Sequence, residues 1–400
     1  MKIRTAALAC LLIIANGGFS LPAKTVAANI GSEASPEPVD APPCVGRDPK
    51  VAMPGAPHGM FAWAPGDRMT YLLKKYVIGK DPTLCGASLV VKWADVEKTK
   101  GSFDFSSVEQ AAKPFTDAGL TVNLLFAEAT EGKDAVTPQW VLGEVPTTTC
   151  GAEAKLPIYW NFKFEADWTA LIKHAIDYFS NKSSIRDQIG YMRFATGGGA
   201  EAIGPPGSYG GHCADTLKNK FGYSYPVWKK HVFKMLEVMA DEPTKHQIIC
   251  ALPSQPGGKS PNELTNEFAT EAASKHVGLS FESLGSHNET APGTQPGKCD
   301  PKDAKFHWCE AYVTYAGTVP LAMQPITATR NTNSGKLDIT NLLPYALDNK
   351  IQIFELYPDE WLEADGAKEW QNFEPGKEQK YKAALQSASL TLGQAAIKSR

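Results

Sequence analysis

Three glutamates occupy positions where a charged side chain is expected to be paired or to take part in catalysis. Glu282 and Glu355 each interrupt a short apolar run, and Glu201 directly follows a Gly-Gly-Gly-Ala stretch. A charge inside an apolar segment is costly to bury unless it is paired or takes part in chemistry. Two carboxyl groups that lie near each other, one protonated and one ionised, can carry out general acid–base catalysis. The residue types therefore predict an acid–base site built from Glu201, Glu282 and Glu355.

Glu201 is the candidate acid/base residue. The glycines before it allow the backbone to approach a ligand closely, and Phe194 can help to desolvate a carboxyl group and raise its pKa. The second carboxylate, a nucleophile or a base, is assigned to Glu355, with Glu282 as the alternative. Each glutamate also has a structural interpretation: Glu201 can cap its loop or pair with Arg193, and the other two can belong to buried ion pairs.

Aromatic and polar residues near the predicted strand ends suit a sugar ligand. Aromatic rings offer flat apolar faces to the C–H faces of pyranoses, and the candidates are Trp63, Trp93, Trp140, Trp160, Tyr209, Tyr357 and Trp361. Trp93, Tyr357 and Trp361 are the best placed, although a single such ring is more often part of a core. His212 lies in a long glycine-rich loop after Glu201. Its side chain either contacts a sugar hydroxyl or faces solvent. The predicted substrate-binding set is Trp93, Arg193, Tyr209, His212, Gln324, Tyr357 and Trp361.

The chain carries the pattern of a scaffold that gathers distant strand ends. Short apolar runs alternate with longer amphipathic stretches from residue 58 onward, as in repeated strand–helix units around a parallel sheet. The predicted strands are Gly59–Ala64, Ala87–Trp93, Thr121–Phe126, Ile189–Ala195, Gln247–Leu252, Val277–Glu282, Pro320–Gln324 and Ile351–Leu356. The predicted helices are Asp67–Ile78, Ser106–Ala118, Glu165–Ser180, Tyr225–Ala240, Ser260–Lys275, Lys302–Tyr315, Ile339–Asp348 and Gly376–Ala396.

Eight such units predict an α/β fold, a single (β/α)8 TIM barrel with enlarged loops and no second domain. The alternative is an open doubly wound sheet, which is expected to carry a glycine-rich phosphate turn after its first strand. Trp63–Asp67 is not such a turn. In a barrel, the chemistry lies at the carboxyl ends of the strands, which is where Glu282, Gln324 and Glu355 are predicted to lie.

The second predicted unit carries a family resemblance. It contains Trp93–Glu97, a Gly-Ser-Phe-Asp-Phe turn at Gly101–Phe105 and a helix that ends before Thr121. This unit resembles the corresponding part of clan A glycoside hydrolases, with the family 42 type nearest. The resemblance implies an acid/base glutamate at the end of strand four, which matches Glu201, and a nucleophilic glutamate at the end of strand seven. At the strand-seven position this chain has Gln324 instead of a glutamate. At the end of strand four, the usual Asn-Glu pair is replaced by Ala200-Glu201.

The net charge and the amino-terminal residues indicate which partners and which compartment to expect. The chain has 40 Lys and Arg against 43 Asp and Glu, a net charge of −3, so no positive field favours nucleic acid. Lys2 and Arg4 precede the apolar run Ala6–Ala15, which predicts a secretory signal peptide at residues 1–27. The run is shorter than the roughly 20 residues of a membrane span. A flexible spacer is expected at 28–50 and the barrel at 51–400.

The cysteines are interpreted for an oxidising compartment, because the protein is expected to be secreted or periplasmic. The predicted disulfides are Cys44–Cys85, Cys150–Cys213 and Cys299–Cys309, although sequence alone does not fix the connectivity. Cys250 lies in an apolar run and is the candidate free thiol. No Cys or His spacing matches a zinc site, and no metal or cofactor is expected.

The sequence therefore predicts a secreted glycoside hydrolase that acts on a poly- or oligosaccharide through two carboxyl groups. One alternative is a carbohydrate-binding barrel without hydrolysis, which the amide of Gln324 favours. Another is a polysaccharide lyase, which would need a base near a uronic acid and a cation for its carboxylate. The sequence makes no prediction of the oligomeric state.

Overall fold

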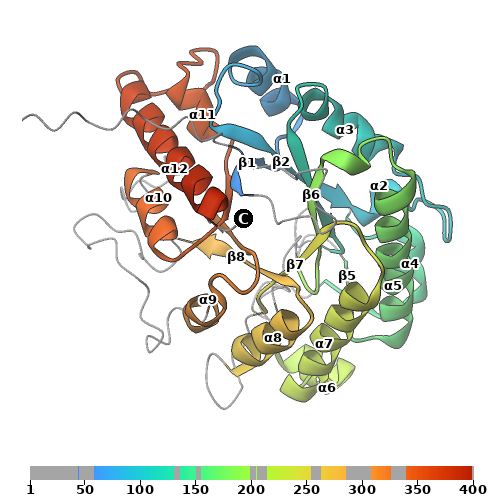
Figure 1. Ribbon diagram of the computed structural model, residues 1–400. Helices are drawn as coiled ribbons and strands as arrows, with labels where there is room; N and C mark the ends of the chain where they lie inside the picture. The colour runs from blue at the N-terminus through green and yellow to red at the C-terminus, as the bar shows by residue number, and fades with distance from the viewer. Residues whose placement is uncertain are drawn as a thin grey trace, which may run out of the picture. The chain divides into compact units, whose positions relative to one another are not determined.

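Eight parallel strands close into a barrel in the computed structural model (Figure 1). The strands are β1 (Gly59–Trp63), β2 (Leu84–Lys92), β3 (Thr121–Ala127), β6 (Ile189–Phe194), β7 (Gln247–Ala251), β8 (Gly278–Leu284), β9 (Leu321–Pro325) and β10 (Ile353–Leu356). Each strand pairs with its neighbour along the chain, and β10 pairs with β1 to complete the barrel. The predicted (β/α)8 barrel is confirmed.

The structure describes residue 44 and residues 58–129, 136–149, 155–198, 204, 214–253, 263–284, 308–325 and 339–398. All of them belong to one unit, Ala41–Arg400. The predicted signal peptide and, apart from Cys44, the predicted spacer lie outside the described residues. No helix in the described part of the chain is long and apolar enough to cross a membrane.

Helices surround the strands (Figure 1). The main ones are α1 (Asp67–Tyr76), α3 (Ser106–Thr116), α5 (Phe162–Asp177), α7 (Tyr225–Asp241), α8 (Glu263–Ser274), α9 (Cys309–Tyr315), α10 (Ile339–Asp348) and α12 (Glu378–Lys398). Helix α5 begins three residues before its predicted start because the side chain of Asn161 caps it, accepting from the backbone N–H groups of Lys163 and Phe164. The predicted starts of α8 and α9 lie outside the described residues.

Short elements that the sequence did not predict lie between the main ones. They are α2 (Trp93–Val96), α4 (Gln139–Glu144), β4 (Thr147–Thr148), β5 (Leu156–Pro157), α6 (Ala214–Phe221) and α11 (Asp359–Ala364), with a π-helical turn at Tyr178–Lys182 and a 3₁₀ turn at Arg186–Gln188. Strands β4 and β5 pair antiparallel outside the barrel. Most of these elements follow the carboxyl ends of barrel strands, where enlarged loops were expected.

Two apolar clusters form the core. The larger one fills the space between the strands and the helices. The smaller one fills the lumen of the barrel and contains Phe61, Cys85, Leu125, Ala127, Val136, Tyr191, Ile249, Ala322 and Ile353. Because side chains alternate between the two faces of a strand, residues two positions beyond Ala322 and Ile353 also point into the lumen. The alternation thus directs Gln324 and Glu355 inward.

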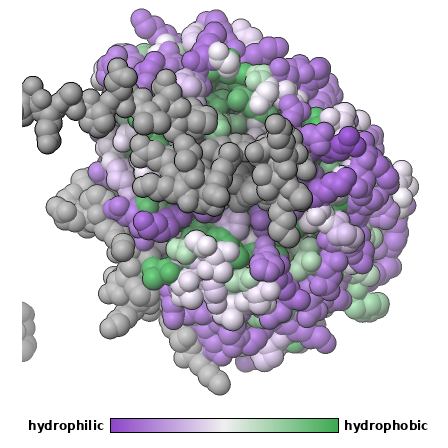
Figure 2. All heavy atoms as spheres, viewed as in Figure 1, coloured by the Kyte–Doolittle hydropathy of each residue, from purple (hydrophilic) through white to green (hydrophobic). Residues whose placement is uncertain are grey.

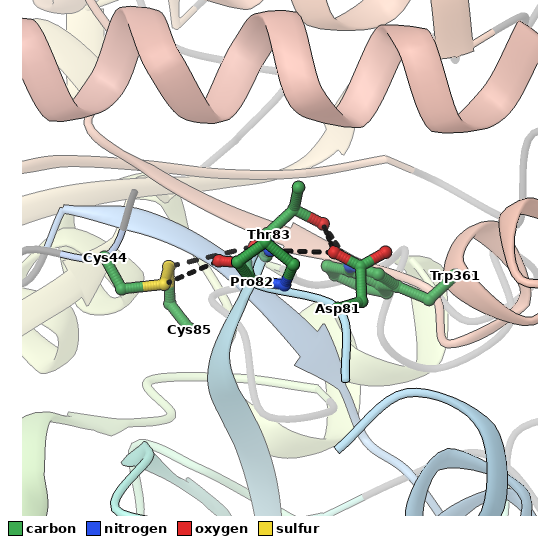
Figure 3. Close-up of a disulfide and its surroundings, with 6 residues drawn as sticks. All are labelled: Cys44, Asp81, Pro82, Thr83, Cys85 and Trp361. Carbon is green, nitrogen blue, oxygen red and sulfur yellow. Dashed lines mark hydrogen bonds between the residues drawn. A yellow bond between two sulfur atoms is a disulfide. The ribbon is translucent and has the colours of Figure 1, made fainter. Parts of the chain in front are cut away.

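A disulfide joins Cys44 to Cys85 at the amino-terminal end of β2 (Figure 3). Cys85 belongs to the lumen cluster and Cys44 packs against that cluster, so the bond ties the segment before the barrel to the start of the lumen. This predicted pair is confirmed. Cys250 is free and buried, as predicted, and burial raises the pKa of its thiol to about 12. Cys309 is disulfide-bonded, whereas Cys150, Cys213 and Cys299 lie outside the described residues.

Candidate active site

A buried guanidinium lies at the centre of the polar residues in the lumen. Arg193, on β6, has its Nη1 atom 2.9 Å from Glu282 Oε1 on β8 and 2.9 Å from Glu355 Oε2 on β10. The same nitrogen donates to Ser280 Oγ at 2.7 Å. The two carboxylate oxygens that share this nitrogen are therefore no further apart than twice 2.9 Å. The structure brings together three residues that the sequence selected separately.

Glu355 is fully enclosed. Its residue is 0% exposed, and it accepts hydrogen bonds from Arg193 at Oε2 and from the Tyr191 hydroxyl at Oε1. Burial, reinforced by the nearby Glu355 carboxylate, raises the pKa of Tyr191 well above its usual range. The phenol therefore remains a proton donor to Glu355, and both carboxylate oxygens are engaged.

Glu282 is more open than Glu355. Its side chain is 6% exposed, and Oε1 accepts from Arg193 and from the Ser280 hydroxyl. Burial raises the pKa of Glu282, and the neighbouring Arg193 acts in the opposite direction. A carboxyl group with a raised pKa exchanges protons nearer to neutral pH, which is the property that general acid or base catalysis requires.

Gln324 lies on the strand between those that carry the two carboxyl groups. Strand β9, which carries Gln324, lies between β8, which carries Glu282, and β10, which carries Glu355. The register between β8 and β9 shifts just beyond Phe281. Gln324 is 2% exposed, and its Oε1 atom is buried with no hydrogen-bond partner among the described residues. An acceptor left in this state lacks the hydrogen bond that nearly all buried polar atoms have.

Two aromatic rings lie next to this group at the carboxyl ends of β1 and β10. Trp63 ends β1 and Tyr357 directly follows β10, and their ring centroids are 5.0 Å apart with an interplanar angle of 53°. Both residues are only partly buried. Since Phe61 is in register with Glu355, the pair lies one step beyond Glu355 toward the carboxyl end of the barrel. Tyr357 thus directly follows the last barrel strand, and its role in binding stays a prediction.

Trp93 and Trp361 have different surroundings from those expected of sugar-binding rings. Trp93 is 0% exposed, donates its indole N–H to Glu97 Oε2 at 2.7 Å and packs against Trp168. Trp361 is also 0% exposed and donates to Thr83 Oγ1 at 3.1 Å, near the amino-terminal end of β2 (Figure 3). In this arrangement both rings are core residues that offer no free face to a ligand.

The remaining predicted site residues, Glu201, Tyr209 and His212, lie outside the described residues. They stay predictions. The sequence did not single out Tyr191 and Ser280, although each lies two residues from a selected residue on the same strand face. That spacing of two was the available signal, because residues i and i+2 of a strand share a face.

Glu128, which follows β3, is a buried carboxyl group that differs from Glu282 and Glu355 in its hydrogen bonding. It is 0% exposed and neither of its oxygens has a hydrogen-bond partner in the described part of the chain. Burial, and to a lesser degree the charge of Glu165, raises its pKa well above the usual range. Burial therefore favours the protonated form of Glu128, and the charge that adds to this effect is that of Glu165 on α5.

A separate surface hollow lies away from these groups. It has a volume of about 440 Å³ and is lined by residues of α3, including Glu109 and Lys113, and by Ser184, Ile185 and Gln188. These segments precede β3 and β6, so the hollow opens toward the amino-terminal side of the barrel wall. The visible outer surface is mainly hydrophilic, with small apolar areas (Figure 2). Among the described residues, no cluster of His, Cys, Asp and Glu is arranged to hold a metal ion.

Comparison with known proteins identifies the fold. No protein-family model matches the chain, and no curated protein matches it. The catalytic domain of β-amylase from Paenibacillus polymyxa has a similar structure, with a TM-score of 0.54 and 13% sequence identity over 82% of this chain and 98% of that chain. A GH10 xylanase from Bispora sp. MEY-1 with xylobiose is also similar, with a TM-score of 0.46 and 11% identity over 82% and 96% of the two chains.

Native xylanase 10B from Thermotoga maritima gives a TM-score of 0.45 and 11% identity over 83% of this chain and 96% of that chain. At these identities the likeness establishes the fold alone. The chain is a single (β/α)8 barrel, and the β-amylase catalytic domain has a similar fold. The resemblance to family 42 stays a prediction.

Proposed function

We propose that the protein is a secreted glycoside hydrolase that cleaves a poly- or oligosaccharide with two carboxyl groups, Glu282 and Glu201. The observation that carries the proposal is the convergence of Glu282 and Glu355 on Arg193 in the lumen, near the carboxyl ends of the strands. Barrel enzymes build their sites at that end. The disulfide between Cys44 and Cys85 supports an oxidising compartment.

Glu282 is the better choice for the second carboxyl group. Glu355, which the sequence favoured, has both oxygens engaged and is fully enclosed. It holds the guanidinium of Arg193 from the opposite side of the barrel and thereby fixes the position of Glu282. Glu282 retains some exposure and a raised pKa, which suits a group that exchanges a proton with substrate or water.

Glu201 supplies the acid in this proposal. It follows the fourth barrel strand, which also carries Arg193, and the family resemblance gives the same position an acid/base role. The acid protonates the leaving oxygen while the other carboxyl group acts on the opposite side of the sugar ring. Trp63 and Tyr357 offer partly exposed ring surface next to Glu355 for the apolar face of the sugar.

A carbohydrate-binding barrel without hydrolysis is the second candidate. Two observations favour it: Gln324 is an amide at the strand-seven position, and both carboxyl groups near it are already paired with Arg193. A lyase has less support, because the Nη1 atom of Arg193 is engaged with protein carboxylates and Arg193 is 0% exposed.

Release of reducing ends from a panel of α- and β-linked glycans tests the proposal. Wild type is expected to cleave at least one glycan, and Glu282→Gln to lose about 10²–10⁴-fold in kcat, the usual size of a general acid–base contribution. Glu369→Gln is the matched control, because Glu369 pairs with Lys75 on the surface. Unchanged cleavage by Glu282→Gln removes Glu282 from the mechanism. Binding of a glycan by wild type without any cleavage favours the second candidate.

A further inference from the structure

Gln324 presents a polar atom that the folded protein leaves without a partner. Its Oε1 atom is buried and accepts no hydrogen bond from any described residue, and the residue is 2% exposed. A buried carbonyl oxygen in this state is destabilising relative to an apolar side chain of similar size. A role in stability therefore does not explain why an amide stands here, whereas a role in binding a donor does.

The surroundings of this atom define which donor fits. Gln324 is on β9, the strand between β8 with Glu282 and β10 with Glu355, and the β8–β9 register shifts just beyond Phe281. Arg193 donates to both flanking carboxylates through the same nitrogen, and Tyr191 occupies the other oxygen of Glu355. Glu282 and Gln324 are thus acceptors on two adjacent strands, and a water molecule has two hydrogens with which to satisfy both.

We infer that Gln324 is a positioning residue that holds the attacking water beside Glu282, so that the glycosidic bond is cleaved with inversion. This inference rests on the proposed function. Gln324 Oε1 accepts one hydrogen of the water and Glu282 accepts the other, which turns a lone pair of the water oxygen toward the sugar. An amide forms no stable glycosyl ester, so Gln324 does not act as a nucleophile. At the position where clan A enzymes carry that nucleophile, Gln324 orients the water molecule.

The reaction balances without any further reactant. The water oxygen forms a bond to the anomeric carbon as the bond from that carbon to the leaving oxygen breaks. The leaving oxygen takes a proton from the acid, assigned to Glu201, and the proton lost by the water passes to Glu282. One water is consumed and two hydroxyl groups are formed. For Glu282 to act as the base, it must be ionised in the resting enzyme.

The anomeric configuration of the first product decides the stereochemistry. Proton NMR during the first minutes of cleavage, before mutarotation, is expected to show the anomer opposite to that of the substrate. Retention overturns this inference and leaves the proposed glycoside hydrolysis standing. Absence of cleavage on every glycan overturns the proposed function and this inference with it. The two failures are therefore distinguishable.

Variants at Gln324 separate positioning from structure. Gln324→Leu removes the acceptor, so kcat is expected to fall about 10²-fold or more with KM changed less than about 3-fold, while Tm stays the same or rises. Gln324→Glu keeps an acceptor oxygen at that position and is expected to be more active than Gln324→Leu. Its acidic pH limb should move to higher pH, because a second carboxyl group raises the pKa of Glu282.

Gln110→Leu on the exposed face of α3 is the matched control and should retain the wild-type kcat. A Gln324→Leu variant that keeps the wild-type kcat and pH profile overturns the inference. A crystal structure supplies a readout that does not depend on activity. An ordered water within hydrogen-bond distance of both Gln324 Oε1 and a Glu282 carboxylate oxygen supports it, and a direct protein donor to Gln324 Oε1 overturns it.

Discussion

Arg193 Nη1 lies 2.9 Å from Glu355 Oε2 although the two residues stand on β6 and β10, four strands apart around an eight-stranded barrel. The arginine side chain therefore spans the lumen from one wall to the opposite wall. Tyr191, two residues earlier on β6, reaches Glu355 across the same space. This polar layer fills the lumen beneath the aromatic pair of Trp63 and Tyr357 and connects residues more than 160 positions apart in the chain.

Removal of the guanidinium should destabilise the protein strongly. Arg193→Met leaves Glu282 and Glu355 buried without their shared cation, and breaking a buried ion pair from one side costs about 3–5 kcal/mol. Urea denaturation at pH 7 measures the loss in the free energy of unfolding. The triple variant Arg193→Met/Glu282→Gln/Glu355→Gln should recover part of it, since it has no uncompensated charge. A loss below about 1 kcal/mol for Arg193→Met would contradict the central place given to this ion pair.

The aromatic pair should act on substrate binding rather than on the chemical step. Tyr357→Ala removes ring surface beside Trp63, and one aromatic contact of about 0.5–1.5 kcal/mol corresponds to a rise in KM of about 2- to 13-fold. Initial rates over a range of glycan concentrations separate KM from kcat. Tyr71→Ala, at a residue 60% exposed on α1, is the control and should leave both constants unchanged. A fall in kcat with KM constant would rule out the platform role.

Much of the fold was predictable from the sequence because each barrel strand is a short apolar run. Seven predicted strands begin within two residues of the observed start, and Ile339–Asp348 coincides with α10. Strand β2 begins three residues earlier than predicted, at Leu84, because Cys85 and Gly86 do not resemble a strand by composition. Short strands β4 and β5 were missed, since two residues carry no periodicity.

The site was predictable only in part. Charges within apolar runs identified Glu282 and Glu355, but their meeting at one nitrogen of Arg193 depends on strand register and barrel closure, which the sequence does not encode locally. The position of an aromatic residue after a strand end also does not predict whether its ring packs into the core or stays exposed. Trp93 and Trp361 turn into the core, whereas Tyr357 stays partly exposed beside Trp63.

The disulfide at the amino-terminal end of the barrel should contribute substantially to stability. Cys44 and Cys85 are separated by 41 positions, and cross-linking a loop of that length stabilises a protein by up to about 4 kcal/mol in the chain-entropy model. Cys44→Ala should lower the free energy of unfolding by about 2–4 kcal/mol in chemical denaturation. Cys44→Ala/Cys85→Ala should lose a similar amount, because the bond and not the thiol is responsible. Equal stability of wild type and both variants would contradict this role.

Asp365, at the end of α11, should make stability depend on pH. Burial, with a further contribution from Asp81, raises the pKa of Asp365 to about 6, and its Oδ2 atom is buried without a described hydrogen-bond partner. Lys382 lies 3.8 Å away, and the Asp365 side chain is 13% exposed. Since the pKa is about 4 in the unfolded chain, the folded protein binds the proton more tightly. The free energy of unfolding should therefore fall as pH rises from about 4 to about 6 and then become constant with respect to this group.

Asp365→Asn isolates that contribution, because asparagine resembles the protonated acid in shape and charge. At pH 4 the variant and wild type should be equally stable, and at pH 7.5 the variant should be more stable by about 1–3 kcal/mol, the upper value corresponding to a shift of about two pK units. Urea denaturation at pH 4, 5, 6 and 7.5 measures the difference. Asp187→Asn, on a side chain 78% exposed, should follow wild type throughout. A difference between Asp365→Asn and wild type that stays constant with pH would mean that Asp365 is ionised in the folded protein over the whole range, and that Lys382 compensates its burial.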